Sequence, residues 1–131
     1  MTEPRRSTWI PRSTPVPNLI LDQLLPKLRD TELRVLLVIV RSTLGWVDRY
    51  TGNRKERERI SSHQFKTRTG RESAAISKAL EELSKVGLIV ITTERGVALR
   101  TPFERRRART KLFYSLHPDL LKSLYQPKFG K

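Results

Sequence analysis

The sequence predicts an α+β fold that is mostly helical and carries one small antiparallel β-hairpin. Three observations lead to it: apolar residues recur at helical spacing in several segments, two short strand-like runs follow them, and a strongly basic stretch joins those runs. The 131 residues suffice for one domain. We expect a folded domain at 18–117, a flexible basic arm before it at 1–17, and a short helix with a tail after it at 118–131.

Two helices are predicted first. One is expected over 18–25, where apolar residues repeat at helical spacing before Pro26, which ends or kinks it. The second should run from Asp30, a good N-cap residue, to about Leu44, and Gly45 supplies its stop. A broad apolar face makes this second helix the expected spine of the core: Leu33, Val35, Leu36, Leu37, Val38, Ile39, Val40 and Leu44.

The next segment, 46–59, is charged and is interpreted as a loop with a turn at Gly52 and Asn53. Trp46 at its start is interpreted as core packing rather than as a ring that stacks on bases. Ser61 and Gln64 then have the spacing of a capping box, in which each residue accepts a hydrogen bond from the other's backbone. This box predicts a short third helix that ends at Gly70.

The fourth helix has the most regular pattern in the chain. Ile76, Ala79, Leu80 and Leu83 recur at helical spacing, and Gly87 follows where a left-handed residue is needed. Strands are predicted next at 88–91 and 111–116, joined by residues 94–110, which we call the basic connection. The second strand alternates, with Leu112, Tyr114 and Leu116 on one face and Phe113 and Ser115 on the other. This order of helices, turn, strand, basic loop and strand is typical of a winged helix-turn-helix, in which the hairpin is the wing.

The charge balance indicates a polyanionic partner. Lys and Arg number 27 against 13 Asp and Glu, which gives a net charge of +14. Such an excess on a small domain is typical of nucleic-acid binding, although a solubilising surface and an anionic membrane remain alternatives. No cysteine is present, which excludes disulfides and fits a reducing cytosol. No run approaches the roughly 18 apolar residues of a membrane span, and no secretory signal is recognisable.

Catalytic and metal-binding patterns are lacking, so we expect no enzyme, no metal and no cofactor. His63 and His117 are distant in sequence and have no cysteine near them, and no phosphate-binding glycine loop occurs. His117 is expected instead to precede and cap the last short helix. The expected partner is double-stranded DNA.

A DNA-reading helix needs one apolar stripe that anchors it and an outer face of small or hydrogen-bonding side chains that can enter the major groove. The fourth helix fits this description, and its predicted recognition residues, with one residue just before it, are Arg71, Ser73, Ala74, Ser77 and Lys78. The alternative is an ordinary surface helix, since polar residues lie opposite the core stripe in any helical bundle.

Phosphate contacts are expected from two further places. Lys66 and Arg68 lie on the third helix, which crosses the DNA backbone in this docking mode. The basic connection supplies the rest: Arg95, Arg100, Arg105, Arg106, Arg107 and Arg109. A solvated charge run is the alternative for the latter group.

Several short segments together resemble a known family. The matching residues are Val16-Pro17-Asn18, Leu21-Asp22, Leu36-Leu37, Arg41-Ser42-Thr43-Leu44-Gly45-Trp46, Arg59-Ile60-Ser61, Thr69-Gly70, Ile76-Ser77-Lys78-Ala79-Leu80, Leu83 and Gly87-Leu88-Ile89. Over roughly residues 16–93 they resemble the N-terminal domain of the phage replication protein O family. The R-x-T-x-G-W element is the most specific part, whereas the second half is common to many winged helices.

The resemblance implies a winged-helix domain that binds repeated sites at a replication origin as a dimer, in the cytoplasm or nucleoid of a bacterial host. Ser73, Ala74, Ser77 and Lys78 again fall on the recognition face. In that family a separate C-terminal region recruits the helicase-loading machinery, and no such region is visible here, which fits a fragment or a stand-alone DNA binder. A transcriptional repressor and a protein-interaction module with an acidic partner remain alternatives.

Overall fold

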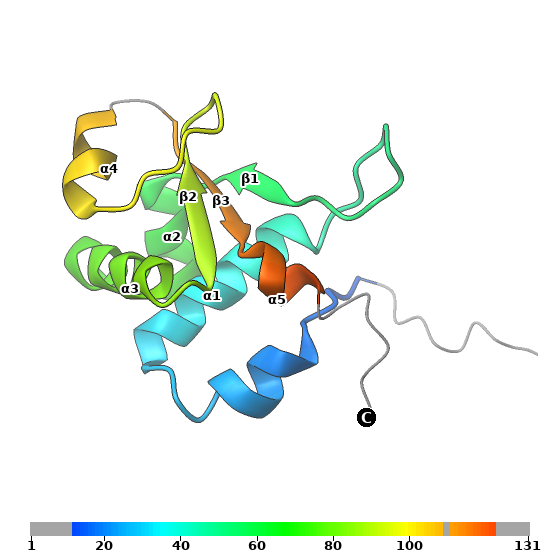
Figure 1. The fold of residues 1–131 in the computed structure, drawn as a ribbon. Coiled ribbons are helices and arrows are strands. Elements are labelled where there is room, and N and C mark those ends of the chain that lie inside the picture. Colours follow the sequence, from blue (N-terminus) through cyan, green and yellow to red (C-terminus); the bar gives the residue numbers. More distant parts are fainter. Residues whose placement is uncertain (1–11, 109–110, 123–131) are drawn as a thin grey trace, which may run out of the picture.

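The computed structural model of the chain describes residues 12–108 and 111–122. Over these residues it is an α+β structure in which helices pack against a small antiparallel sheet (Figure 1). In chain order its elements are the π-helical turn η2 (Ile20–Leu24), α1 (Asp30–Thr43), β1 (Arg57–Arg59), α2 (Ser62–Thr69), α3 (Ser73–Lys85), β2 (Ile89–Thr92), α4 (Pro102–Ala108), β3 (Phe113–Leu116) and α5 (Pro118–Lys122).

The sheet has the strand order β1-β3-β2, with β3 antiparallel to both neighbours. Tyr114 of β3 lies opposite Ile91 of β2 and opposite Glu58 of β1. Tyr114 and Leu116 are buried, whereas the residues between and before them are only partly covered, so the predicted alternation of this strand is confirmed. The predicted antiparallel pairing of the two strands around the basic connection is confirmed as well.

Strand β1 corrects the prediction that residues 46–59 form only a loop. All three of its residues are charged and two are exposed, so the apolar alternation that marks a strand in a sequence is absent. The strand is defined by its backbone pairing with β3 at the edge of the sheet, where charged side chains are common. The turn before it agrees with the prediction, because Gly52 has a φ of 77° and Asp48 N–H donates to the Asn53 carbonyl at 2.7 Å.

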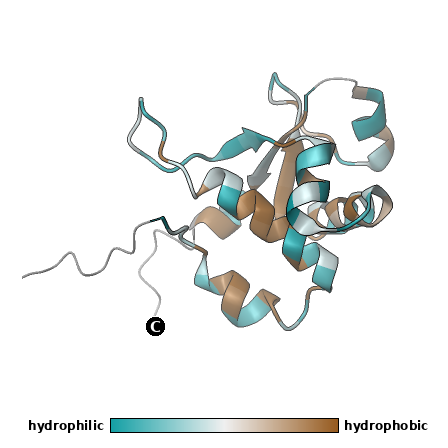
Figure 2. Ribbon diagram, turned by 180° about the vertical axis from the view of Figure 1, so that it is seen from behind, coloured by the Kyte–Doolittle hydropathy of each residue, from teal (hydrophilic) through white to brown (hydrophobic). Residues whose placement is uncertain are grey.

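Helix α1 is the spine of the core, as its apolar pattern predicts. Val35, Leu36 and Ile39 are fully buried, and the helix packs against α2, α3 and the sheet. Figure 2 shows apolar residues concentrated on this central helix and on the strands that cover it. Leu37 is a correction to the predicted buried face: its side chain is 36% exposed, because it lies on the side of α1 that no other element covers fully.

The segment before Pro26 is helical from residue 18 to 24, as predicted, but over η2 it has the hydrogen-bonding pattern of a π-helix rather than of an α-helix. Leu25 N–H donates to the Ile20 carbonyl at 2.8 Å, a hydrogen bond that spans five residues. Ile20 is fully buried in the core, so the apolar pattern identified its packing correctly. Of the arm predicted at 1–17, only the end is described, and there Val16 packs against the core; the rest lies outside the described residues.

Helices α2 and α3, which follow β1, agree closely with the prediction from the sequence. Ser61 N–H donates to Gln64 Oε1 at 2.9 Å and Gln64 N–H donates to Ser61 Oγ at 3.1 Å, so the predicted capping box starts α2. Gly70 ends α2 with a φ of 71°, and Gly87 follows α3 with a φ of 81°. Both glycines adopt the left-handed conformation that other residues adopt only with strain.

Helix α4 corrects the prediction that the basic connection is irregular. It begins with a second capping box: Glu104 N–H donates to Thr101 Oγ1 at 3.1 Å, while Glu104 Oε1 accepts from Thr101 N–H at 3.2 Å. None of its residues is buried, so it has no apolar stripe that would reveal it by periodicity. In both views α4 lies at the same end of the molecule as α3 (Figures 1 and 2).

Trp46 is a further correction, since it does not pack in the core. Its side chain is 54% exposed, and the Arg41 guanidinium stacks over its ring with 5.1 Å to the ring centroid. The chain has already left α1 at this point, because Trp46 N–H donates to the Thr43 carbonyl in the turn that follows the helix. The indole therefore covers the outside of α1.

The described chain ends in the short helix α5. The cap predicted for it is confirmed, because Asp119 N–H donates to His117 Nδ1 at 3.1 Å. Leu120 is buried in the same core as α1. The remainder of the predicted tail, from residue 123 onward, lies outside the described residues.

Candidate nucleic-acid interface

Helix α3 is fixed in the molecule by its apolar stripe. Ile76, Ala79, Leu80 and Leu83 are all buried, as predicted, and the helix packs against α1, α2 and β2. Burial of this stripe is worth roughly 1.5–3 kcal/mol for each large aliphatic side chain. The helix is therefore held rigidly while its remaining sides face solvent or the loops around it.

The four recognition residues predicted on α3 are all exposed: Ser73, Ala74, Ser77 and Lys78. As residues i, i+1, i+4 and i+5 of one helix, they are neighbours on one broad face, and the two edges of that face line different cavities. Ser73 and Ser77 line a cavity of about 280 Å³ together with residues of α4 and β3. Lys78 lines a different cavity of about 750 Å³, between α3 and the segment that leads into α1. The two serines thus lie on the side of α3 toward the basic connection, and the lysine lies on the other side.

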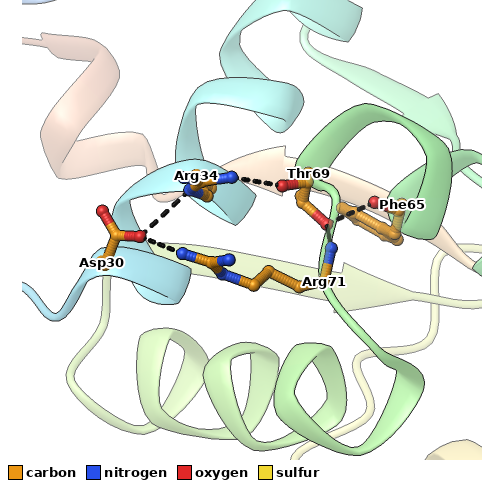
Figure 3. A network of polar contacts seen from close by, with 5 residues as sticks. All are labelled: Asp30, Arg34, Phe65, Thr69 and Arg71. Atoms are coloured by element: carbon orange, nitrogen blue, oxygen red, sulfur yellow. Dashed lines mark hydrogen bonds and ion pairs between the residues drawn. The ribbon is translucent and has the colours of Figure 1, made fainter.

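Arg71, which precedes α3, is held by a network of polar contacts (Figure 3). Its guanidinium donates to Asp30 Oδ2, and the same oxygen accepts from Arg34 Nε at 3.1 Å. Arg34 Nη1 in turn donates to the Thr69 carbonyl at 2.6 Å, and Arg71 N–H donates to Thr69 Oγ1 at 3.1 Å. The network ties the start of α1 to the turn between α2 and α3.

Asp30 is not the N-cap of this helix, contrary to the prediction from the sequence. The N-cap of α1 is Arg29, whose N–H donates to Glu32 Oε1 at 2.9 Å, and Asp30 is the first helical residue. The hydrogen bond from Arg71 and the nearby charge of Arg34 lower the pKa of Asp30 below its usual value of 3.8. Arg71 is thus paired within the protein, and it would have to leave Asp30 to contact DNA.

The two basic residues predicted on α2 are exposed but engaged. Lys66 Nζ lies 3.9 Å from Glu72 Oε1, at the margin of an ion pair. Arg68 Nη1 donates to Ser42 Oγ of α1 at 2.9 Å, which holds the guanidinium close to the helix surface. Both cations remain accessible to a phosphate.

Most arginines of the basic connection are exposed to solvent. Arg95 lies in a tight turn, in which Thr93 N–H donates to the Val97 carbonyl at 2.9 Å. Arg107 stacks over the ring of Phe103, with 5.3 Å to the ring centroid. The exposed members are Arg95, Arg100, Arg106 and Arg107, whereas Arg109 lies outside the described residues.

Arg105 is the exception, and the sequence does not distinguish it from its neighbours. Its Nη1 and Nη2 atoms are covered from solvent and have no hydrogen-bond partner among the described residues. Burial lowers the pKa of Arg105, and the same environment raises the pKa of Tyr114 to about 12 through burial of the phenol. The T-P-F-E sequence at 101–104 has the spacing of a capping box and is the signal that could have predicted helix α4. The helix places Pro102 and Arg105 one turn apart on the same side.

Other kinds of site find no support in the described part of the chain. Over residues 12–108 and 111–122, no three His, Asp or Glu side chains are grouped so that they could hold a metal ion. Within the same ranges, no helix has the length and apolar character needed to cross a bilayer. The exposed basic residues around α3 are therefore the site that we consider further.

No protein-family model, no curated protein and no solved structure was found to match this chain.

Proposed function

We propose that this chain is a winged-helix domain that binds double-stranded DNA sequence-specifically, with α3 as its recognition helix. The order of elements supports the fold assignment, because the chain runs through α1, β1, α2, α3, β2 and β3. Strands β2 and β3 pair antiparallel, so the basic connection that joins them has the position of a wing in this proposal. The tight turn at Gly70 between α2 and α3 is the helix-turn-helix of this proposal.

One observation carries the DNA-binding proposal. Helix α3 is pinned by a buried stripe, while Ala74 and Lys78 are exposed on it and the arginines of α4 lie at the same end of the molecule. A helix with small residues near its N-terminus can approach the floor of the major groove, and a lysine can reach a guanine edge or a phosphate. The arginines beside it would contact the backbone of the same duplex.

The net charge of +14 supports a large electrostatic contribution to binding. Each neutralised phosphate releases condensed counterions, so affinity for duplex DNA should fall steeply with salt concentration. A module that binds an acidic protein would show no such salt-sensitive binding of DNA.

The biological role that we propose is replication initiation for a phage or other mobile element. This part rests on the resemblance of residues 16–93 to the phage replication protein O family. The resemblance also implies dimeric binding to repeated origin sites and contact with the replication machinery. A map of the protein's sites on DNA would test it: iterated sites within an origin agree with initiation, whereas a single palindrome over a promoter indicates a repressor.

Fluorescence anisotropy with duplex and single-stranded oligonucleotides, at two salt concentrations, tests the binding proposal. Arg106→Ala should weaken binding to every duplex about equally and lower the slope of log affinity against log salt by about 1, because a phosphate contact is lost. Lys78→Ala should weaken the preferred site by about 1–3 kcal/mol more than random DNA, because a base contact is lost.

Equal losses for these two variants on both kinds of duplex would contradict the division between base and phosphate contacts. Failure of the wild-type chain to bind duplex DNA at low salt would contradict the proposal as a whole.

A further inference from the structure

The cavity between α3 and α4 contains a cation that lacks a partner. Arg105 lines the cavity, and within residues 12–108 and 111–122 its two terminal nitrogens, which are covered from solvent, find no hydrogen-bond acceptor. A buried guanidinium is unfavourable unless it is paired, because the charge loses its hydration. Orphaned donors of this kind in a folded protein call for a partner that the folded chain itself does not supply.

The polar groups around Arg105 can all donate hydrogen bonds to an anion. Three serine hydroxyls line the same cavity, from Ser62, Ser73 and Ser77, and among the described residues none of them is engaged in a side-chain hydrogen bond. Arg106 contributes a second guanidinium to the wall. No carboxylate lines the cavity; Glu81 acts on Arg105 through its charge but forms no ion pair with it in the described structure.

The backbone adds to this positive character. Ser73 is the first residue of the thirteen-residue helix α3, and the N-cap Glu72 makes no side-chain hydrogen bond to the first turn. The free N–H groups and the helix dipole at such an end favour an anion. The floor of the cavity is apolar and includes Phe65, Ile76 and Leu80, which lowers the local polarity and strengthens charge-assisted hydrogen bonds.

We propose that this cavity binds a phosphate group: the covered guanidinium of Arg105 turns into the cavity as the principal donor, and Ser62, Ser73, Ser77 and the start of α3 complete the site. A guanidinium can donate two parallel hydrogen bonds to one phosphate, which a lysine cannot do. Where the phosphate belongs to the DNA backbone, the inference rests on the proposed function; a free phosphate ion would use the same contacts.

A titration of the isotope-labelled full chain with inorganic phosphate, at constant ionic strength, tests the site directly. We expect saturable NMR shifts at the Ser73 and Ser77 amides and at the Arg105 Nε–H. Arg105→Gln should abolish the serine shifts. Arg49→Gln, which removes the same charge from an exposed loop residue outside the proposed interface, should retain them. Absence of saturable shifts in the wild type, or equal shifts in Arg105→Gln, would overturn the proposal.

Duplex binding by the same variants identifies the source of the phosphate. If it is the DNA backbone, Arg105→Gln should lose about tenfold in affinity and Arg49→Gln about twofold or less, since a bidentate charged contact exceeds a general charge effect. Arg105→Lys should fall between them. Equal losses for Arg105→Gln and Arg49→Gln, with the phosphate shifts intact in the wild type, assign the site to the free ion and exclude the DNA backbone.

The proposed DNA binding and the proposed phosphate site can be contradicted independently. A wild-type chain that ignores duplex DNA but shows saturable phosphate shifts contradicts the proposed function and leaves the phosphate site standing. Thermal unfolding controls for misfolding: phosphate should raise the unfolding midpoint of the wild type and of Arg49→Gln but not that of Arg105→Gln. A midpoint for Arg105→Gln that rises with phosphate as much as the wild type's contradicts the assignment of Arg105.

Discussion

Helix α3 and helix α4 of the basic connection lie at the same end of the molecule (Figure 1), but different forces hold them in place. Helix α3 buries four apolar side chains against the core. Helix α4, inside the connection, buries none and depends on the hydrogen bonds that Thr101 and Glu104 exchange at its start. One helix is anchored by long-range packing, and the other is stabilised mainly by local contacts.

This difference explains why one helix is visible in the sequence and the other is hidden. Apolar periodicity records which side of an element is buried, so it predicts α3 and also the buried side of β3. It carries no information about a helix without a buried side, and a run of arginines then looks like a loop. For α4, the capping residues are the only local signal.

The largest effect should come from the anchor of α3. Leu83→Ala should lower the free energy of unfolding by about 2–5 kcal/mol, because Leu83 is fully buried and its truncation leaves a cavity. Val97→Ala, in the exposed turn of the basic connection, should change it by less than about 0.5 kcal/mol. Urea unfolding followed by circular dichroism measures both values. Similar losses for the two variants would show that the connection is as tightly packed as α3.

A smaller effect should separate the two capping boxes. Ser61→Ala should lower the free energy of unfolding by about 1 kcal/mol, because α2 carries the buried Phe65 and unfolds with the core. Thr101→Ala should leave global stability nearly unchanged and instead speed amide hydrogen exchange over α4. If Thr101→Ala lowers global stability as much as Ser61→Ala, α4 is part of the cooperative core and the contrast is wrong.

The candidate site was predictable where it depends on local pattern and not where it depends on distant partners. The exposure of Ser77 and Lys78 follows from the helical spacing of the buried stripe. Nothing in the spacing shows that Arg71 reaches Asp30, 41 residues earlier in the chain. The burial of Arg105 likewise depends on α4 folding back toward α3, so the sequence groups it with exposed arginines.

The smallest effect on stability should come from the contacts of Arg71 and Arg34 with Asp30, and it should depend on pH. The pKa of Asp30 is lowered in the folded chain, first by the hydrogen bond from Arg71. The stabilisation is therefore fully present above pH 3.8, the usual value, and is lost as the pH falls through the lower value of the folded state. Asp30→Asn should lower the unfolding midpoint slightly at pH 6, and the difference from the wild type should shrink as the pH approaches 2.

Asp22→Asn is the matched control, because Asp22 is exposed and takes part in no ion pair among the described residues. It should give a difference that is smaller and changes less with pH. Because Asp30 is itself at the surface, the effect of Asp30→Asn should also weaken in 1 M salt. A difference that stays constant from pH 6 to 2 would mean that the hydrogen-bonding shape of the side chain, rather than its charge, fixes the turn before α3. In that case the charge of Asp30 does not stabilise the turn, and Arg71 would lose only this hydrogen bond by turning toward a phosphate.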